Sequence, residues 1–391
     1  MLNTSLSPWP SFTQEEADAV SKVLLSNKVN YWTGTECREF EKEFAAFAGT
    51  EYAIALANGT LALDVALKAM NIGAGDDVIV TSRTFLASAS SIVTAGANPV
   101  FADVDLNSQN TSAETIQAAL TPNTKAIIVV HLAGMPAEMD DIMALAQQHN
   151  LWVIEDCAQA HGAKYKGKPV GSIGHVGAWS FCQDKIMTTG GEGGMVTTND
   201  KELWSKMWSY KDHGKSYDAV YNREHAPGFR WLHESFGTNW RMMEMQAVIG
   251  RIQLQRMPEW TAKRQAHAAK LTETLSQFNS IRLVEVPDYI EHAQYKFYAF
   301  VKPEHLKEGW SRDRIIDELN ARKVPTYQGS CSEVYLEKAF EGTPWRPKER
   351  LKNAIALGDT SLMFLVHPTL TTEEIQFCCQ HIAAVLSEAT R

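Results

Sequence analysis

The sequence lacks any apolar run long enough to cross a membrane. Its longest apolar stretches, such as Ala126 to Val130 and Leu362 to Val366, have the length of strands, whereas a transmembrane helix needs about 20 residues. The N-terminal segment MLNTSLSPWPSFTQEEADAV has no basic start followed by an apolar run, so it does not resemble a signal peptide. We therefore expect a soluble, cytoplasmic protein.

The sequence also lacks the cysteine spacing of a zinc site and the charge of a nucleic-acid-binding protein. None of its six cysteines forms a CxxC pair and no histidine stands at zinc-finger spacing, so we expect reduced thiols and no metal. Acidic residues number 46 against 37 basic ones, which makes the formal net charge -9. Such a chain has no basic field with which to hold nucleic acid.

Internal repeats and low-complexity segments are absent as well. What is present is an ordinary globular composition over 391 residues, more than one hydrophobic core usually serves. We expect two domains, a large one over 1–254 and a small C-terminal α+β domain over 255–391. The reason is that the sequence pattern past Ser280 changes to that of a smaller α+β region.

The large domain shows a repeated alternation of short strand-like runs and helical runs. This rhythm predicts an α/β fold, with a mostly parallel central sheet sandwiched by helices. Ligands of such sheets bind beyond the carboxyl ends of the strands. The strand-like runs are YAIALAN, DDVIV, PVFADV, KAIIVV and LWVIEDC, and a hairpin-like stretch follows from Gly177.

Other segments predict helices and one long loop. Helices are expected at Thr13–Leu25 and at Cys37–Ala48, the second stopped by Gly49. A later helix runs through Pro258, where we expect a break or a kink. The region from Gly214 to Asn239 has little periodicity, and a loop of that length is usually functional or partner-facing.

The residue of greatest chemical interest is Lys185, in the run GAWSFCQDKIMTTGGEGG. It follows a strand, with Ser180 five residues before it and four glycines after it. An amine in that place suits covalent chemistry with a carbonyl group. An isolated lysine before a hairpin is far more often a solvated residue, so the interpretation depends on other segments.

Three other segments supply groups that complement an amine. Asp156 ends the strand LWVIED, from which a carboxylate can hold a proton on a pyridine nitrogen. Gly59 and Thr60 open a helix after a strand, which is a ready phosphate site or a plain helix cap. Phe85 is either a platform for a flat ring or core packing. Together they match the needs of pyridoxal phosphate.

At these residues the sequence resembles the DegT/StrS-type sugar-nucleotide aminotransferases, which have the aspartate-aminotransferase fold, fold type I of pyridoxal-phosphate enzymes. The matching segments occur in order over almost the whole chain. They are ANGTLAL, the run from Glu155 EDCAQAHGA, SFCQDKIMTTGGEGGMVTT, GTNWRMMEMQAVIGRIQL and HPTLTTEEI.

The resemblance implies a role for each matching residue. It makes Lys185 the Schiff-base lysine, Asp156 the partner of the pyridine nitrogen and Gln159 a neighbour of the ring hydroxyl. The phosphate contacts would be Gly59, Thr60 and Ser180, and Phe85 would stack on the ring. Asn239 would reach the phosphate held by the other subunit of a homodimer. The chain departs from frequent family residues at Cys182 and Asn58.

The resemblance also implies a reaction. An amino group would pass from L-glutamate to a nucleotide-linked keto sugar while the cofactor cycles between pyridoxal and pyridoxamine phosphate. A dTDP- or UDP-4-keto-6-deoxyhexose is the first expectation for the acceptor, and a 3-keto isomer is the second. A regulatory or sensory protein that only binds the cofactor is a third possibility, although the presence of Lys185 and Asp156 favours turnover. Tyr31 and Trp32 are either sugar contacts or aromatic core.

Overall fold

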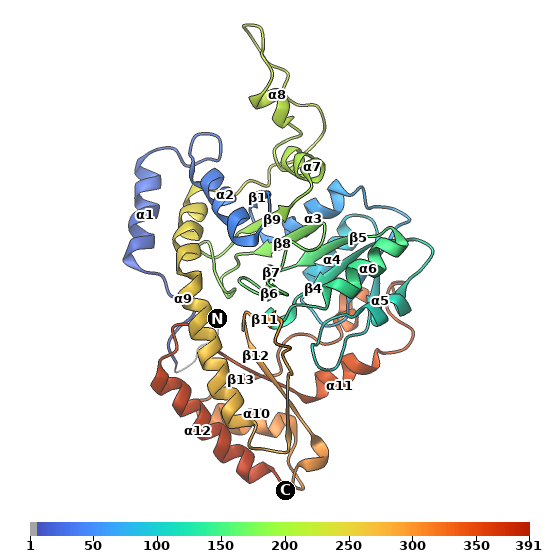
Figure 1. Ribbon diagram of the computed structural model, residues 1–391, viewed down its shortest axis with the longest axis vertical. Helices are drawn as coiled ribbons and strands as arrows, with labels where there is room; N and C mark the ends of the chain where they lie inside the picture. The colour runs from blue at the N-terminus through green and yellow to red at the C-terminus, as the bar shows by residue number, and fades with distance from the viewer. Residues whose placement is uncertain (1–5) are drawn as a thin grey trace.

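The computed structural model describes residues 6–391, which form a larger N-terminal part and a smaller C-terminal part (Figure 1). The larger part is built on a seven-stranded sheet of order β1-β9-β8-β5-β4-β2-β3. The neighbours from β8 to β3 are parallel, whereas β9 runs antiparallel to β1 and to β8. The strands are β1 (Tyr52–Leu56), β2 (Asp77–Thr81), β3 (Asn98–Ala102), β4 (Thr124–Val130), β5 (Trp152–Asp156), β8 (Val176–Ser180) and β9 (Gly194–Thr198).

Helices cover both faces of this sheet, as the apolar strands predict. Successive side chains of a strand point to opposite faces, so Val78 and Val80 join one buried cluster while Ile79 joins another. The first face packs against α3 (Gly59–Ala69), α4 (Ala87–Thr94) and α7 (Lys201–Lys211). The second packs against α2 (Glu36–Ala48), α5 (Ala113–Ala119), α6 (Met139–His149) and the first half of α9 (Glu244–Leu275).

The ends of the N-terminal helices follow from local chemistry. Helix α1 (Gln14–Leu25) begins after Thr13, whose backbone N–H donates to the Glu16 carboxylate at 2.6 Å in a capping box. Helix α2 ends at Gly49, which takes a left-handed φ of 68° that suits glycine. Both helices are therefore confirmed to within a residue.

Helix α9 runs through Pro258, as predicted, and is one helix of 32 residues. Of the two alternatives given for this residue, the break is wrong and the kink stays a prediction. A proline removes one backbone hydrogen bond from a helix. Here Met257 and Trp260 are buried in the core on either side of it, and their packing keeps the two halves joined. Residue 255 lies inside α9, and the division into 1–254 and 255–391 stays a prediction.

The C-terminal part has a four-stranded antiparallel sheet of order β10-β12-β14-β13. One face forms a core with the second half of α9 and with α10 and α12. On the other face, Tyr298 and Phe300 pack against Val130 and Leu132 of the larger part. The elements are β10 (Ile281–Leu283), β12 (Phe297–Val301), α10 (Arg312–Ala321), β13 (Thr326–Tyr327), α11 (Lys352–Thr360), β14 (Ser361–Phe364) and α12 (Thr372–Ala389).

Two smaller features complete the fold. A three-stranded sheet joins the two parts through β6 (Lys164–Tyr165), β7 (Lys168–Pro169) and β11 (Ile290–Glu291). The expected loop over 214–239 contains a short helix, α8 (Tyr217–Tyr221), and projects from the larger part (Figure 1). None of the helices within residues 6–391 combines the length and apolar character that a bilayer-spanning helix requires.

Candidate functional site

The sheet brings the chemistry-bearing residues to one edge. Strands β5 and β8 are parallel neighbours, and Asp156 at the end of β5 lies beside Ala178 of β8. Strand β8 ends two residues later at Ser180, and Lys185 follows on the next loop. Because parallel strands end on the same side of a sheet, the positions of Asp156, Ser180 and Lys185 converge there.

The N-terminus of α3 meets the end of β8 at this edge. A Cβ atom placed on Gly59 would lie 2.5 Å from Cβ of Ser180, so the backbone at Gly59 touches Ser180. Asn58 caps the helix by accepting the Leu61 N–H at 3.0 Å. Among the described residues, the N–H groups of Gly59 and Thr60 have no hydrogen-bond acceptor. Free N–H groups at a helix N-terminus beside a hydroxyl form a suitable site for a phosphate.

This close approach makes Gly59 a sensitive position. We expect Gly59→Ala to displace Ser180 and to weaken phosphate binding by roughly 10-fold or more, since at least one charge-assisted hydrogen bond is lost. The measurement is the dissociation constant of pyridoxal phosphate, followed by its absorbance. Gly75→Ala strains a backbone with φ 90° but brings its added Cβ within 4 Å of no atom, so it is the control for a mere loss of stability. Equal affinity in the Gly59 variant and the wild type would contradict the role of this contact.

Asp156 is buried and held in place by two hydrogen bonds. Its Oδ2 accepts the Ser88 hydroxyl at 2.8 Å, and its Oδ1 accepts the Ala158 N–H at 3.1 Å. Burial raises the pKa of Asp156 above its ordinary value, while these two bonds and the charge of Lys185 oppose the rise. A cation placed against Asp156 would favour its ionised form, as the partner of a pyridine nitrogen requires.

Phe85 belongs to the same neighbourhood and lies two residues before α4, which begins at Ala87. The preceding residue, Thr84, shares a hydrogen bond of 2.8 Å with Ser88, the residue that binds Asp156. The Phe85 side chain is 70% exposed. It is therefore a ring available to a ligand at this edge, and its stacking role stays a prediction.

Gln159 connects this edge to the C-terminal part. Its Oε1 accepts the Ala133 N–H at 2.8 Å, and the Ala133 carbonyl accepts the Tyr295 N–H at 2.9 Å. The Lys185 ammonium lies 5.4 Å from the centroid of the Tyr295 ring. The Tyr295 hydroxyl donates to Asp184 at 2.5 Å. The segment before β12 therefore forms one wall beside the lysine.

The N-terminal segment fixes the backbone of the lysine loop. The indole Nε1 of Trp9 donates to the Lys185 carbonyl at 2.9 Å. The Trp9 ring packs edge-on against Trp260 of α9 and stacks on His367. Lys185 is thus positioned by residues from both ends of the chain.

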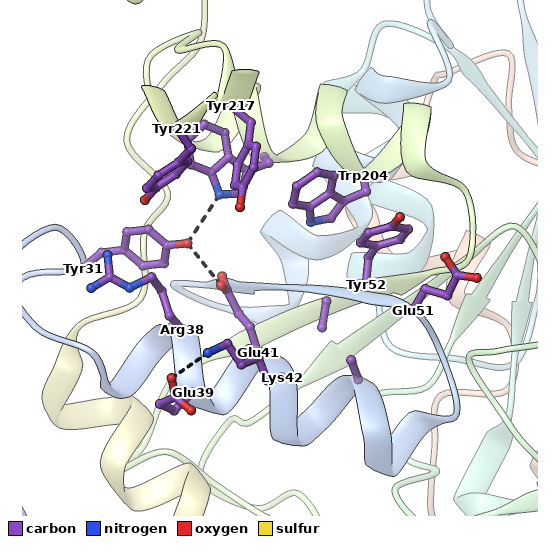
Figure 2. A pocket seen from close by; sticks show the side chains of 13 residues that line it. Tyr31, Arg38, Glu39, Glu41, Lys42, Glu51, Tyr52, Trp204, Tyr217 and Tyr221 are labelled. Atoms are coloured by element: carbon purple, nitrogen blue, oxygen red, sulfur yellow. Dashed lines mark hydrogen bonds and ion pairs between the residues drawn. The ribbon is translucent and has the colours of Figure 1, made fainter. Parts of the chain in front are cut away.

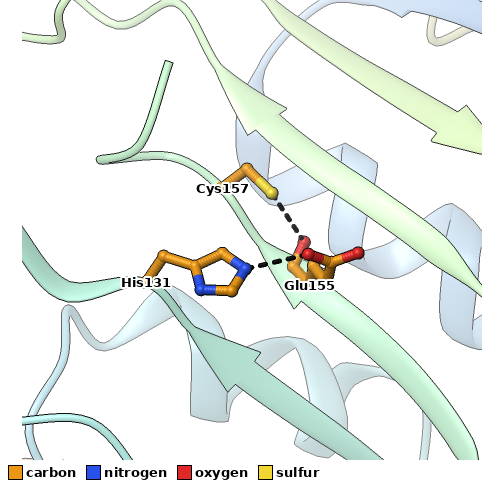
Figure 3. A group of neighbouring side chains, drawn as sticks. All are labelled: His131, Glu155 and Cys157. Carbon is orange, nitrogen blue, oxygen red and sulfur yellow. Dashed lines mark hydrogen bonds and ion pairs between the residues drawn. The ribbon is translucent and has the colours of Figure 1, made fainter. Parts of the chain in front are cut away.

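A buried group of potential metal ligands lies next to Asp156 and is drawn in Figure 3. Glu155 accepts the Nε2–H of His131 at 2.9 Å and the N–H groups of three backbone residues, at 171, 173 and 174. Burial alone raises the pKa of Glu155, but the bonds from His131, Gly171 and Gly174 outweigh it and leave the pKa below its ordinary value. The Nδ1 of His131 accepts the Ala137 N–H. Because His131 and Glu155 are already hydrogen-bonded within the fold, we interpret the group as structural.

A cavity of about 580 Å³ lies apart from the predicted site, among α2, α7 and α8 (Figure 2). Its lining includes Tyr31, Arg38, Glu41, Tyr52, Trp204 and Tyr221, and none of the predicted site residues. Tyr31 is 2% exposed, and its hydroxyl donates to Glu41 at 3.1 Å. Tyr31 is therefore a core residue on the evidence of its burial.

Asn239 is exposed at the base of the projecting segment. Its backbone pairs with Asp212, and the next residue but one, Arg241, donates to Asp212 at 2.8 Å. The carbonyl of Trp240 accepts the Ala57 N–H at 3.0 Å. Asn239 thus lies on a fixed segment near the start of α3, and its role at another subunit's site stays a prediction.

Four residues of the site escaped the sequence analysis. Ser88, Asp184 and Tyr295 contact the predicted residues directly, and Trp9 holds their loop. Only Asp184 could have been singled out from the sequence, since it directly precedes Lys185. The others belong to an ordinary helix, a strand start and a terminal segment, none of which marks a site.

Comparisons with known proteins found similar sequences and structures. The model of the DegT/DnrJ/EryC1/StrS aminotransferase family matches residues 10–383. The crystal structure of the aminotransferase from Psychrobacter cryohalolentis has 64% sequence identity and a TM-score of 0.97, and the match covers 98% of this chain and 99% of that one. GDP-perosamine synthase of Caulobacter vibrioides is 42% identical over 72% of this chain and 73% of its own. The UDP-N-acetyl-3-dehydro-alpha-D-glucosamine 3-aminotransferase of Acidithiobacillus ferrooxidans is 40% identical over 71% of each.

Proposed function

Because this chain belongs to the DegT/DnrJ/EryC1/StrS aminotransferase family, we propose that it transfers the amino group of L-glutamate to the ketone of a nucleotide-linked sugar. The observation that carries the proposal is the meeting of Lys185, Asp156 and the Gly59–Ser180 contact at one edge of the sheet. A reactive amine, a buried carboxylate and an anion site in that arrangement are the groups that a phosphorylated pyridine aldehyde needs.

Pyridoxal phosphate is the cofactor of this family, and the described residues fit it. The N–H groups of Gly59 and Thr60 beside Ser180 would hold the phosphate, and Asp156 would hold the proton of the ring nitrogen. When bound, the cofactor supplies an aldehyde that reacts with amines and a ring that takes up electrons. Gln159, whose Oε1 accepts the Ala133 N–H, and the exposed Phe85 are the residues that we propose to contact the ring.

Lys185 has two proposed tasks. Its amine would hold the cofactor, and as a free amine it would take the proton from the α-carbon of the amino acid and return it during the transfer. The 2.9 Å hydrogen bond from Trp9 to its carbonyl and the wall formed by Tyr295 limit the positions that its side chain can take. Proton transfer requires such positioning.

The acceptor we propose first is a 4-keto-6-deoxyhexose on a dTDP or UDP carrier. A 3-keto sugar is the second candidate, and the name of the Acidithiobacillus ferrooxidans relative, a 3-aminotransferase for a UDP sugar, supports it. The name of the Caulobacter vibrioides relative specifies a GDP sugar. These relatives differ in carrier, so they support the class of acceptor and leave the individual sugar to experiment.

The test has two stages. Purified holoenzyme should lose its yellow colour when L-glutamate is added and should release 2-oxoglutarate. It should then aminate one member of a panel of 4-keto and 3-keto sugar nucleotides, detected by the mass of the product. Colour without turnover of any donor would refute the proposal and favour a regulatory protein that only binds the cofactor.

We further propose that the enzyme acts as a homodimer through the projecting segment. Its aromatic residues Phe229, Trp231 and Phe236 are 76%, 81% and 99% exposed, which is unusual for a surface that stays in water. A second copy of the chain would cover them, and Asn239 at the base would then reach the phosphate site of that copy.

Mixing two inactive variants tests this arrangement. Subunits with Asn239→Ala and subunits with Lys185→Ala should regain activity when they are unfolded, mixed and refolded together, because one site of the hybrid has both residues intact. Random pairing in a two-fold dimer gives about a quarter of the wild-type activity. No recovery, with dimers verified by analytical ultracentrifugation, would show that Asn239 does not serve the other subunit.

A further inference from the structure

A second ammonium group lies beside the reactive lysine. Lys296 directly precedes β12, and its Nζ is 4.8 Å from the centroid of the Tyr295 ring. The Nζ of Lys185 is 5.4 Å from the same centroid. Two ammonium groups therefore share one aromatic ring at the proposed active site.

The charges around these two lysines do not balance. Asp184 is the carboxylate that influences both, and its Oδ2 already accepts the Tyr295 hydroxyl. Arg264 adds a third cation. Arg264 is only 1% exposed. Its Nη1 makes long hydrogen bonds of 3.4 and 3.3 Å to the carbonyls of residues 294 and 295. Its Nε and Nη2 have no hydrogen-bond partner among the described residues. Lys185, Lys296 and Arg264 are thus three cations in this region. The carboxylates that interact with the two lysines are Asp184 and, at Lys185 alone, Asp156, so three cations stand against two carboxylates.

The nearby histidines do not change this balance. Burial lowers the pKa of both His161 and His367 to about 3, so both are neutral at physiological pH. Burial also lowers the pKa of Lys296 to about 8. The charge of Asp184 raises this pKa, whereas the charges of Arg264 and Lys185 lower it further. At pH 7 most of the Lys296 side chains are still protonated. The excess charge at this wall is positive.

Lys296 is available to a ligand. Within residues 6–391 its Nζ has neither a hydrogen-bond acceptor nor an ion-pair partner, and its side chain is partly exposed. Its contact with the Tyr295 ring gives the ammonium a modest attraction, which explains its orientation but leaves its N–H groups unbonded. An ammonium group held in this way has a strong preference for an anion.

The position of Lys296 also fits a ligand of Lys185. The neighbouring Tyr295 N–H binds Ala133, which in turn binds Gln159. The backbone at Lys296 is thereby tied to the side of the site where the cofactor ring is expected. Asp184 and Tyr295 place Lys185 on the same wall.

We propose that Lys296 binds the carboxylate of a substrate that reacts at Lys185. The expected carboxylate is one of the two of L-glutamate, and an acidic keto sugar would offer the same chemistry. This inference rests on the proposed aminotransferase function and names the class of ligand that its site selects.

The test compares Lys296→Met with Lys296→Arg in the holoenzyme. Lys302→Met, at the other end of β12, is the matched control, since the Lys302 side chain makes no described contact. The first measurement is the L-glutamate concentration that gives half the maximal rate of cofactor conversion. The second is the dissociation constant of glutarate, a dicarboxylate without an amine, measured by calorimetry.

We expect Lys296→Met to raise both constants roughly 10- to 100-fold, the effect of losing a charged hydrogen bond. Lys296→Arg should restore most of the binding, and Lys302→Met should leave both constants unchanged. If Lys296→Met weakens only the reaction with the keto sugar, the carboxylate belongs to the sugar. If neither L-glutamate, glutarate nor the keto sugar binds more weakly, the inference is wrong.

The failure of this inference is distinguishable from failure of the proposed function. A wild-type holoenzyme that does not react with L-glutamate or any keto sugar refutes the aminotransferase proposal. A wild type that reacts normally, together with a Lys296→Met variant that reacts equally well, refutes only the role of Lys296. L-alanine, which lacks the second carboxylate, shows which carboxylate of the donor is bound. An effect of Lys296→Met on L-glutamate but not on L-alanine assigns Lys296 to the side-chain carboxylate.

Discussion

Replacing Lys185 by alanine will abolish transamination, with a loss on the order of 10⁴-fold, because one residue supplies both the attachment of the cofactor and the proton transfer. Borohydride reduction of the wild-type holoenzyme should add the mass of the reduced cofactor to the peptide containing Lys185. The same treatment should leave the corresponding peptide of the variant unmodified. Turnover is measured from the release of 2-oxoglutarate.

Two controls separate chemistry from folding. Lys185 is partly exposed and its side chain is not part of a buried cluster, so the alanine variant should unfold at nearly the wild-type temperature. A small primary amine added to the solution should restore part of the activity, because it can carry the missing proton. A Lys185→Ala enzyme that transaminates at the wild-type rate would end the proposal.

Replacing Asp156 by asparagine should have the next largest effect. The amide oxygen can still accept the Ala158 N–H while the amide nitrogen donates to the Ser88 hydroxyl. The amide has no charge, however, with which to hold a proton on the ring nitrogen. We expect the rate of both half-reactions to fall by roughly 100- to 1000-fold, the typical cost of removing one preorganised electrostatic group. Stopped-flow absorbance measures each half-reaction separately.

The stability of this variant provides a sharp control. Burial raises the pKa of Asp156 in the folded chain above its ordinary value of 3.8. When the pKa of a carboxyl group is higher in the folded than in the unfolded chain, its ionisation lowers the free energy of unfolding. The loss begins as the pH rises above the pKa of the unfolded chain and is complete above the pKa of the folded chain. Without cofactor, Asp156→Asn should therefore be at least as stable as the wild type at pH 7. A variant that is both inactive and unfolded would contradict this account.

Ser88→Ala is a milder change that tests the hydrogen bond from Ser88 to Asp156. This change removes a single hydrogen bond and keeps the charge, so the rate should fall by only about 10-fold or less. An effect as large as that of Asp156→Asn would mean that geometry, and not charge, is the main contribution of Asp156.

Much of the site was predictable because its residues follow strand ends in a βα pattern. Asp156 and Ser180 end two apolar runs that the sequence predicts as strands, and the structure pairs those strands. Gly59 opens a helix directly after a strand, and it touches Ser180. Local sequence was sufficient here because strand ends and helix starts are set by residues within a few positions.

The wall beside Lys185 was not predictable in the same way. Tyr295 and Lys296 are more than a hundred residues from Lys185, directly before a strand whose pattern indicates only a small sheet. That α9 has no break at Pro258 could not be predicted, for a related reason. A proline breaks a helix locally, but burial of Met257 and Trp260 compensates, and burial depends on distant elements.

By itself, the sequence determined the α/β fold, the family and the main residues of the proposed chemistry, because apolar periodicity and short ordered motifs encode these directly. Only the tertiary structure decided which charges face one another. It placed Lys296, Arg264 and Asp184 around one tyrosine beside Lys185. An electrostatic environment depends on distances between residues far apart in the chain, and folding alone sets those distances.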